Sequence, residues 1–268
     1  MTIYRNHNRE QNIVLRATGL GRAFKHDSWV LRDINLELKR GEFAAVLGLS
    51  GSGKTTLFNI LAGLDQPDLG LVEVNETIGY MMQKDLLLPW KRIIDNISLP
   101  LIIRGIARRE AEQRVLLHLP AFGLKGLERS WPAQLSGGER QRAALLRTYL
   151  HAGTIMLLDE PFAGIDAITR ENMQKWLKNI HNELKLTILL ITHDVEEAIA
   201  LADTIHVLSS NRPAALHAPI NLIDSVVPIS GEHNETKCAA GSEFQIRYRQ
   251  DPGLKQQIRE LLYTPFGA

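Results

Sequence analysis

The stretch "GLSGSGKTT", residues 48–56, stands between two segments of different pattern. The apolar run Phe43–Leu47 before it predicts a buried strand, and the residues Thr55–Ala62 predict a helix. A glycine-rich loop at this junction, ending in Lys54 and Thr55, fits the phosphate-binding pattern G-x-x-x-x-G-K-[ST]. An ordinary Gly-Ser turn is the alternative for the bare motif. The strand and helix around it favour a triphosphate site.

The residue types in this loop suit the phosphates of a nucleotide. Glycines let successive backbone N–H groups turn inward around an anion. Lys54 would reach the β- and γ-phosphates, Thr55 would bind Mg²⁺ through its hydroxyl, and the helix dipole would add to the attraction. The candidate nucleotide-binding residues here are Gly48, Leu49, Ser50, Gly51, Ser52, Gly53, Lys54, Thr55 and Thr56.

A second element, "TIMLLDEP" at residues 154–161, places two acids at the end of an apolar run. Adjacent carboxylates that leave a buried strand suit a Mg²⁺ ligand, Asp159, and a base that orients water, Glu160. Solvated acids at a strand end are the alternative. The phosphate-binding pattern elsewhere in the chain favours the catalytic interpretation.

Composition limits the class of protein. The 268 residues are 44% hydrophobic, enough for one large domain or for a domain with a smaller insertion. A formal net charge of +1 gives no reason to expect nucleic acid as a partner. A lone cysteine, Cys238, and a polar N-terminal region predict a cytoplasmic protein. No window approaches the roughly 20 apolar residues that cross a bilayer, so work at a membrane would need another chain.

Alternation of strand-like and helix-like segments predicts an α/β fold with a mostly parallel sheet and an antiparallel β flank from the first two runs. The strand-like runs are Ile13–Arg16, Ile34–Leu38, Phe43–Leu47, Ile155–Asp159, Thr187–Thr192 and Thr204–Leu208. The helix-like runs include Thr55–Ala62, Gly137–Leu150, Arg170–Leu184 and Val195–Leu201.

Domain boundaries follow from changes in this pattern. We expect a single ATPase domain over residues 12–210, with a helical subdomain inserted at about 95–135. Residues 209–244 have a loop-like composition, and a short helix is expected around Leu254–Tyr263. The residues 211–268 are therefore assigned to a C-terminal extension.

The segment "LSGGERQR", residues 135–142, is the most specific string in the chain. Ser136 and Glu139 form a capping box, which predicts a helix start. Capping does not explain the poor helix formers Gly137 and Gly138 in the first turn, whereas backbone donors for an anion would. This string resembles the signature motif of the ATP-binding subunit of ABC transporters, which implies a P-loop ATPase core with ATP and Mg²⁺ as ligands.

The resemblance extends over about residues 12–210 and implies further roles. Gln83, in "YMMQKDLLLPW", matches a glutamine that contacts Mg²⁺ and the attacking water. His193, in "LLITHDVEEA", matches a histidine that meets the γ-phosphate, although taken alone it reads as a capping or surface residue. Asp166, in "AGID", matches the aspartate of the family's D-loop, but the three residues before it differ from the commonest sequence of that loop.

The family also implies an adenine-stacking ring and a dimer. Phe24 is the better match for the ring, with Trp29 close enough to compete, and either ring could instead belong to the core. Two copies would pair head to tail, so that Ser136, Gly137 and Gly138 of one copy close over the γ-phosphate held by the other. Hydrolysis would remove those contacts and open the dimer.

The strings "QKDLLLPWKRIIDNISLPL" and "DEPFAGIDAITR" resemble the importer branch for nitrate, sulfonate, taurine and related solutes. This implies permease subunits, an external solute-binding protein and a peripheral place on the cytoplasmic side of the membrane. Trp90, in Leu-Leu-Pro-Trp, either docks on the permease or packs under the helical insert. The rival functions are a soluble ABC ATPase unconnected with transport and a small-molecule kinase, for which "LSGGERQR" has no role.

Overall fold

The computed structural model describes residues 12–24, 28–210, 213–223, 245–248, 251 and 253–263. The chain divides into two compact units, each drawn from several stretches of sequence. The first comprises Met1–Leu15, Leu38–Gly41 and Val74–Leu189, and the second comprises Arg16–Glu37, Glu42–Glu73 and Leu190–Ala268.

The second unit carries most of a small sheet with the strand order β2-β1-β4, formed by β1 (Ile13–Ala23), β2 (Trp29–Lys39) and β4 (Leu69–Val74). The Phe24 amide donates to the Ser28 carbonyl at 3.3 Å, and the Arg40 amide donates to the Asn12 carbonyl at 2.7 Å. Bonds at these two ends show that β1 and β2 run antiparallel. This is the expected antiparallel flank, with strands longer than the apolar runs predicted.

The larger sheet of the second unit contains β3 (Phe43–Leu47), β8 (Thr204–Val207), β9 (Ile220–Ile223) and β10 (Gln245–Tyr248) in the order β10-β9-β8-β3. β3 pairs parallel with β8, and β10 pairs parallel with β9, while β8 and β9 are antiparallel. All residues of β3 and β8 are buried, as expected of strands covered on both faces.

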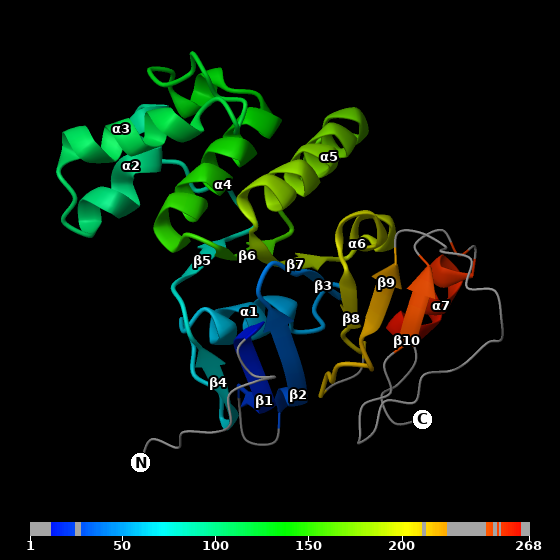
Figure 1. Cartoon of the computed structure of the whole chain (residues 1–268). Helices are drawn as coiled ribbons and strands as arrows, with labels where there is room; N and C mark the ends of the chain where they lie inside the picture. The colour runs from blue at the N-terminus through cyan, green and yellow to red at the C-terminus, as the bar shows by residue number, and fades with distance from the viewer. Residues whose placement is uncertain are drawn as a thin grey trace. The chain divides into compact units, whose positions relative to one another are not determined.

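Helices of this unit follow the strands that position them (Figure 1). α1 (Lys54–Leu61) follows the loop after β3, and α6 (Val195–Leu201) follows β7 (Thr187–Thr192). α7 (Leu254–Tyr263) packs on α6 and β8, and its apolar stripe of Leu254, Ile258 and Leu262 is buried. A stripe at this spacing is what a surface helix presents to a core.

The first unit combines the pair β5 (Ile78–Met81) and β6 (Ile155–Asp159) with helices. The two strands are parallel, with Ile78 opposite Ile155. Helices α2 (Ile93–Ile103), α3 (Arg108–His118) and α4 (Gly137–Ala152) lie together in Figure 1, and α2 packs on both others. A 3₁₀ turn, Pro132–Gln134, precedes α4, and α5 (Ala167–Leu184) completes the unit.

The predicted helical insert at about 95–135 is helical in the structure, although its first helix begins at Ile93. The prediction of an irregular segment over 209–244 is wrong at Ile220–Ile223, which forms β9, and residues 224–244 lie outside the described residues. The expected final helix occurs as α7. Among the described residues, no helix has the length and apolar character that crossing a bilayer requires.

Candidate functional site

The phosphate loop, residues 48–56, lies between β3 and α1 as predicted. Gly51 and Gly53 have φ of 80° and 101°, values that a side chain disfavours. A Cβ at Gly48 would lie 2.8 Å from Ser52 Oγ, and one at Gly53 would lie 3.0 Å from both Val30 and Leu31. Glycine is therefore favoured at 51 by conformation, at 48 by space, and at 53 by both.

Lys54 points back into the phosphate loop. Its Nζ donates to the carbonyl oxygens of Gly48 at 2.8 Å and Leu49 at 2.9 Å, and the residue is only 6% exposed. Ser52 Oγ is also buried and has no hydrogen-bond partner among the described residues. A buried ammonium, an unsatisfied hydroxyl and the N-terminus of α1 together fit a phosphate group.

The end of β7 lies beside the start of this loop. The Gly48 amide donates to the Thr192 carbonyl at 3.4 Å. His193 is the next residue after Thr192 in the chain. His193 is exposed, and the cap of α6 is instead Asp194, whose carboxylate accepts from the amides of Glu196 and Glu197. The structure therefore assigns capping to Asp194 and leaves the His193 ring at the surface.

The two candidate adenine-stacking rings differ in accessibility. Phe24 is 61% exposed at the end of β1. Trp29 is half-buried, and a Cβ on Gly21 would lie 2.8 Å from its ring. A ring that already packs against backbone has less surface for a base, so the geometry favours Phe24.

In the first unit, Asp159 and Glu160 end β6 in different surroundings. Asp159 is 5% exposed and accepts a hydrogen bond from Tyr80 Oη at 3.4 Å. Burial and the Asp159 charge raise the pKa of the Tyr80 hydroxyl, so that it remains a donor. Glu160 is half-buried with φ of 45°, an uncommon conformation that a functional residue often holds.

Gln83 lies beside the proposed base. Its Nε2 donates to Glu160 Oε2 at 3.2 Å, which brings together two residues 77 positions apart. The sequence pattern alone did not predict this contact.

The segment after Gln83 is fixed to α4. Arg147 donates to the carbonyls of Asp85 at 2.6 Å and Leu86 at 2.8 Å. Burial lowers the pKa of the Arg147 guanidinium. The two carbonyl acceptors fix its position. Trp90 is 70% exposed, so it does not pack under the helical insert, and the docking alternative stands.

The signature segment, residues 135–142, starts α4 with the predicted capping box. Ser136 Oγ accepts from the Glu139 amide at 3.3 Å, and Glu139 Oε2 accepts from the Ser136 amide at 2.7 Å. The Ser136 amide, and next its hydroxyl at 2.8 Å, donate to the Glu139 carboxylate and so lower the pKa of Glu139. Packing gives a reason for glycine at 138 that capping does not, because a Cβ there would lie 3.1 Å from Thr169 of α5. Gly137 has no such neighbour, since its nearest one is 3.9 Å away.

Asp166 has a structural role that sequence reasoning missed. It is the N-cap of α5, and its carboxylate accepts from the Thr169 amide at 3.0 Å. That amide is the main reason for a lowered pKa at Asp166. Aspartate three residues before threonine at a helix start was the available signal.

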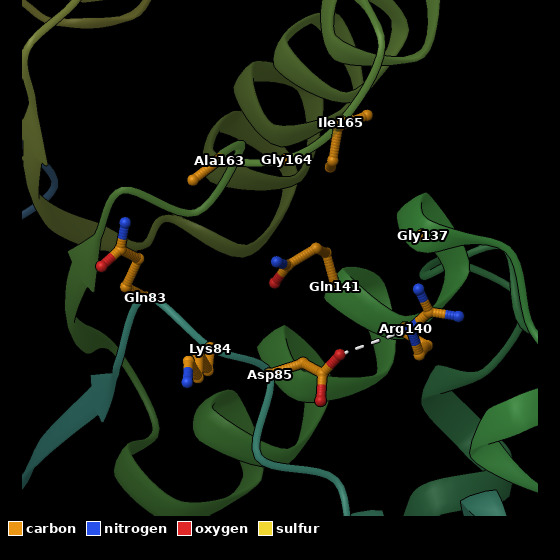
Figure 2. A pocket seen from close by; sticks show the side chains of 9 residues that line it. All are labelled: Gln83, Lys84, Asp85, Gly137, Arg140, Gln141, Ala163, Gly164 and Ile165. Atoms are coloured by element: carbon orange, nitrogen blue, oxygen red, sulfur yellow. Dashed lines mark ion pairs between the residues drawn. The ribbon is translucent and has the colours of Figure 1, made fainter.

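Three of these segments border one pocket of about 350 Å³ in the first unit, drawn in Figure 2. The Gln141 side chain points into it, and its Oε1 is buried without a hydrogen-bond partner among the described residues. Arg140 pairs with Asp85 across the pocket at 3.4 Å. The lining residues are Gln83, Lys84, Asp85, Gly137, Arg140, Gln141, Ala163, Gly164 and Ile165.

The oxygen donors predicted for Mg²⁺ are of the right chemistry: the Thr55 hydroxyl, the Gln83 amide oxygen and the Asp159 carboxylate. No group of three His, Cys, Asp or Glu side chains suited to a metal occurs within the described ranges. A Mg²⁺ that takes one carboxylate and completes its shell with phosphate oxygens and water needs no such group.

Comparison with known proteins agrees with this geometry. Residues 31–163 match the family described as ABC transporter. The aliphatic sulfonates import ATP-binding protein SsuB 1 of Rhodococcus jostii is 45% identical over 73% of this chain and 79% of its own length. The formylaminopyrimidine import ATP-binding protein ThiZ of Halalkalibacterium halodurans is 44% identical over 71% of this chain and 77% of its own.

Solved structures are similar as well. The dimeric structure of a bacterial ABC transporter cassette has a TM-score of 0.66 and 28% identity, covering 77% of this chain and 98% of that one. A dimeric post-hydrolysis cassette with ADP and phosphate has the same TM-score and 27% identity, with the same coverage.

Proposed function

Since the chain belongs to the ABC transporter family of ATP-binding proteins, we propose that it hydrolyses ATP to power import of a small solute through a separate membrane permease. The observation that carries this is the phosphate loop, whose glycine conformations and inward-pointing Lys54 fit a nucleoside triphosphate. The names of the relatives, which describe import of sulfonates and formylaminopyrimidine, support the direction and the class of solute.

In this proposal the phosphate loop binds the β- and γ-phosphates. Lys54 exchanges a carbonyl partner for phosphate oxygen, and Ser52 Oγ donates to the same anion. Thr55, Asp159 and Gln83 would hold Mg²⁺, which would offset the negative charge on the phosphate oxygens. Phe24 stacks on adenine.

Glu160 accepts a proton from the attacking water. Gln83, whose amide already contacts Glu160, orients that water, and His193 donates to the γ-phosphate. The positive φ of Glu160 supports its role because a strained backbone is retained where it serves a side-chain position.

Two copies of the chain enclose ATP head to tail. Ser136, Gly137 and Gly138 of one copy meet the γ-phosphate held by the other, and Asp166, at the start of α5, also binds the nucleotide. The dimeric state of the similar cassettes supports this arrangement. Gly137, in the first turn of the signature helix, also supports it, because the nearest atom to a Cβ placed there is 3.9 Å away.

The remaining parts of the proposal concern partners and place. We assign residues 12–210 to the ATPase domain, with the helical insert at about 95–135, and 211–268 to an extension. The exposed Trp90 and Leu86, on a segment fixed by Arg147, form a firm apolar dock for the permease on the cytoplasmic side of the membrane. An external solute-binding protein would deliver the solute.

The test has two measurements: the product formed from ATP, and co-purification of the chain with a membrane permease. The full chain, expressed with the permease encoded beside it, should co-purify with that hydrophobic protein and release free phosphate from ATP. Trp90→Ser should lower co-purification while leaving the basal release of phosphate by the separate chain unchanged. A phosphorylated small molecule in place of free phosphate would establish a kinase, and activity with no permease partner would establish a soluble ATPase.

A further inference from the structure

Arg22, near the end of β1, holds two carboxylates that follow α1 in the chain. Its Nη2 lies 2.9 Å from Asp65 Oδ1, and its Nη1 lies 3.2 Å from Asp68 Oδ1. The Arg22 side chain is 21% exposed, so the pairs are partly shielded from water. A planar guanidinium that spans two carboxylates has a fixed orientation, which a lysine would not have.

Backbone bonds join the same two segments. Asp68 Oδ2 accepts from the Ala23 amide at 2.8 Å, and the Asp68 amide donates to the Gly21 carbonyl at 2.9 Å. The Asp65 amide in turn donates to the Asn59 carbonyl, within α1, at 3.1 Å. The C-terminal end of strand β1 is therefore fixed to α1, the helix that begins at Lys54.

The guanidinium also lies near Phe24. Arg22 Cζ is 5.5 Å from the centroid of that ring, within the range of a cation–π contact. Phe24 is 61% exposed, and Arg22 Nε has no hydrogen-bond partner among the described residues. The place of the guanidinium beside the ring thus depends on its pairs with Asp65 and Asp68.

We propose that Arg22, held by Asp65 and Asp68, is a positioning residue that fixes the Phe24 ring for adenine and sets its place relative to the phosphate loop. The inference rests on the proposed stacking of Phe24 on ATP. An exposed ring that is held in one orientation loses less side-chain freedom when a base stacks on it. Arg22 therefore increases affinity for the base and has no effect on affinity for the phosphates.

The experiment separates base binding from phosphate binding in the full chain, by calorimetric titration with ATP and with inorganic tripolyphosphate. Phe24→Ala should weaken ATP binding roughly tenfold, in line with the loss of one base–aromatic stack. Arg22→Met should weaken it by about threefold. Tripolyphosphate should bind both variants as it binds the original chain, which also shows that they are folded.

A double variant tests whether Arg22 acts through the ring. Arg22→Met with Phe24→Ala should bind ATP no more weakly than Phe24→Ala alone, since one effect depends on the other. Arg16→Met is the matched control, because Arg16 also pairs from β1 with a carboxylate, Glu37, at 2.9 Å. It should change neither affinity. Asp68→Asn, which keeps an acceptor for the Ala23 amide, should give a smaller loss confined to ATP.

The outcomes distinguish the inference from its premise. If Phe24→Ala leaves ATP affinity intact, the proposed stacking is wrong and the inference fails with it. If Phe24→Ala weakens ATP binding but Arg22→Met does not, only the role of Arg22 is wrong. Equal loss of ATP and tripolyphosphate in Arg22→Met, or additive losses in the double variant, would show a general structural role and overturn the inference.

Discussion

In the phosphate loop the backbone itself forms the site, whereas in the signature segment the side chains expected to meet nucleotide already cap a helix. Gly51 and Gly53 hold a positive φ, Gly53 at the N-cap of α1, and Lys54 donates to the Gly48 and Leu49 carbonyls of the same loop. Ser136, by contrast, exchanges hydrogen bonds with Glu139. A substitution in the loop should alter ligand binding, while one in the signature segment should alter stability as well.

The largest expected effect lies outside both, at the proposed base. Glu160→Gln should slow phosphate release by roughly a hundredfold or more while ATP still binds, because an amide accepts no proton from water. The Gln83 amide can still meet the new side chain, so the local structure should persist. The measurement pairs phosphate release with ATP titration, and Glu171→Gln, on an exposed face of α5, is the control. Turnover close to that of the original chain would rule out this assignment.

Lys54→Ala tests the loop side of the comparison. Loss of the ammonium facing the phosphates should weaken ATP and tripolyphosphate equally, by roughly tenfold or more. The thermal midpoint without ligand should fall less than for a core substitution, because the Lys54 ammonium donates to carbonyls of its own loop, Gly48 and Leu49, and fills no part of the apolar core. Lys175→Ala removes a surface lysine paired with Glu171 and should bind ATP normally. Unchanged affinity in Lys54→Ala would disprove the role of the loop.

Two adjacent glycines of the signature segment, Gly137 and Gly138, should differ in how much a side chain destabilises the protein. Gly138→Val should destabilise the protein by about 1–3 kcal/mol, because its Cβ already approaches Thr169 and the added methyls have no room. Gly137→Val meets open space and should change the free energy of unfolding by less than about 1 kcal/mol. Urea denaturation of both variants measures this difference. Equal destabilisation would mean that packing on α5 does not explain Gly138.

The smallest effect concerns the pH dependence of the capping box. The pKa of Glu139 is lower in the folded chain than its usual value, so its contribution to stability is present above that usual value. It is lost as the pH falls through the lowered, folded pKa. The thermal midpoint of Glu139→Gln should therefore fall less between pH 6 and pH 3 than that of the original chain. Parallel curves for the two proteins would contradict this.

Much of the fold could be predicted from sequence where an apolar run ends sharply at polar residues. β3, β6, β7 and α6 occur with the expected bounds. β4 was missed because its residues are exposed or half-exposed and show no alternation. β5 and β9 have four residues each, too few for a periodic signal.

In the candidate site, too, some features could be predicted from the local sequence and others could not. The phosphate loop was predictable because its chemistry is contained in nine consecutive residues. The contact of Gln83 with Glu160 joins positions 77 apart, and the crowding of Gly138 depends on Thr169 in another helix. Such information arises only when the chain is folded, so no local pattern carries it.

The buried position of Lys54 bears on the kinetics of nucleotide capture. Lys54 as a residue is 6% exposed, and its ammonium donates to the Gly48 and Leu49 carbonyls in place of water. An incoming phosphate therefore meets a cation that has already exchanged part of its hydration for these carbonyls, and most of the solvent to be shed in that encounter is on the phosphate. Association should accordingly depend more on how fast the polyphosphate dehydrates than on any rearrangement of the lysine.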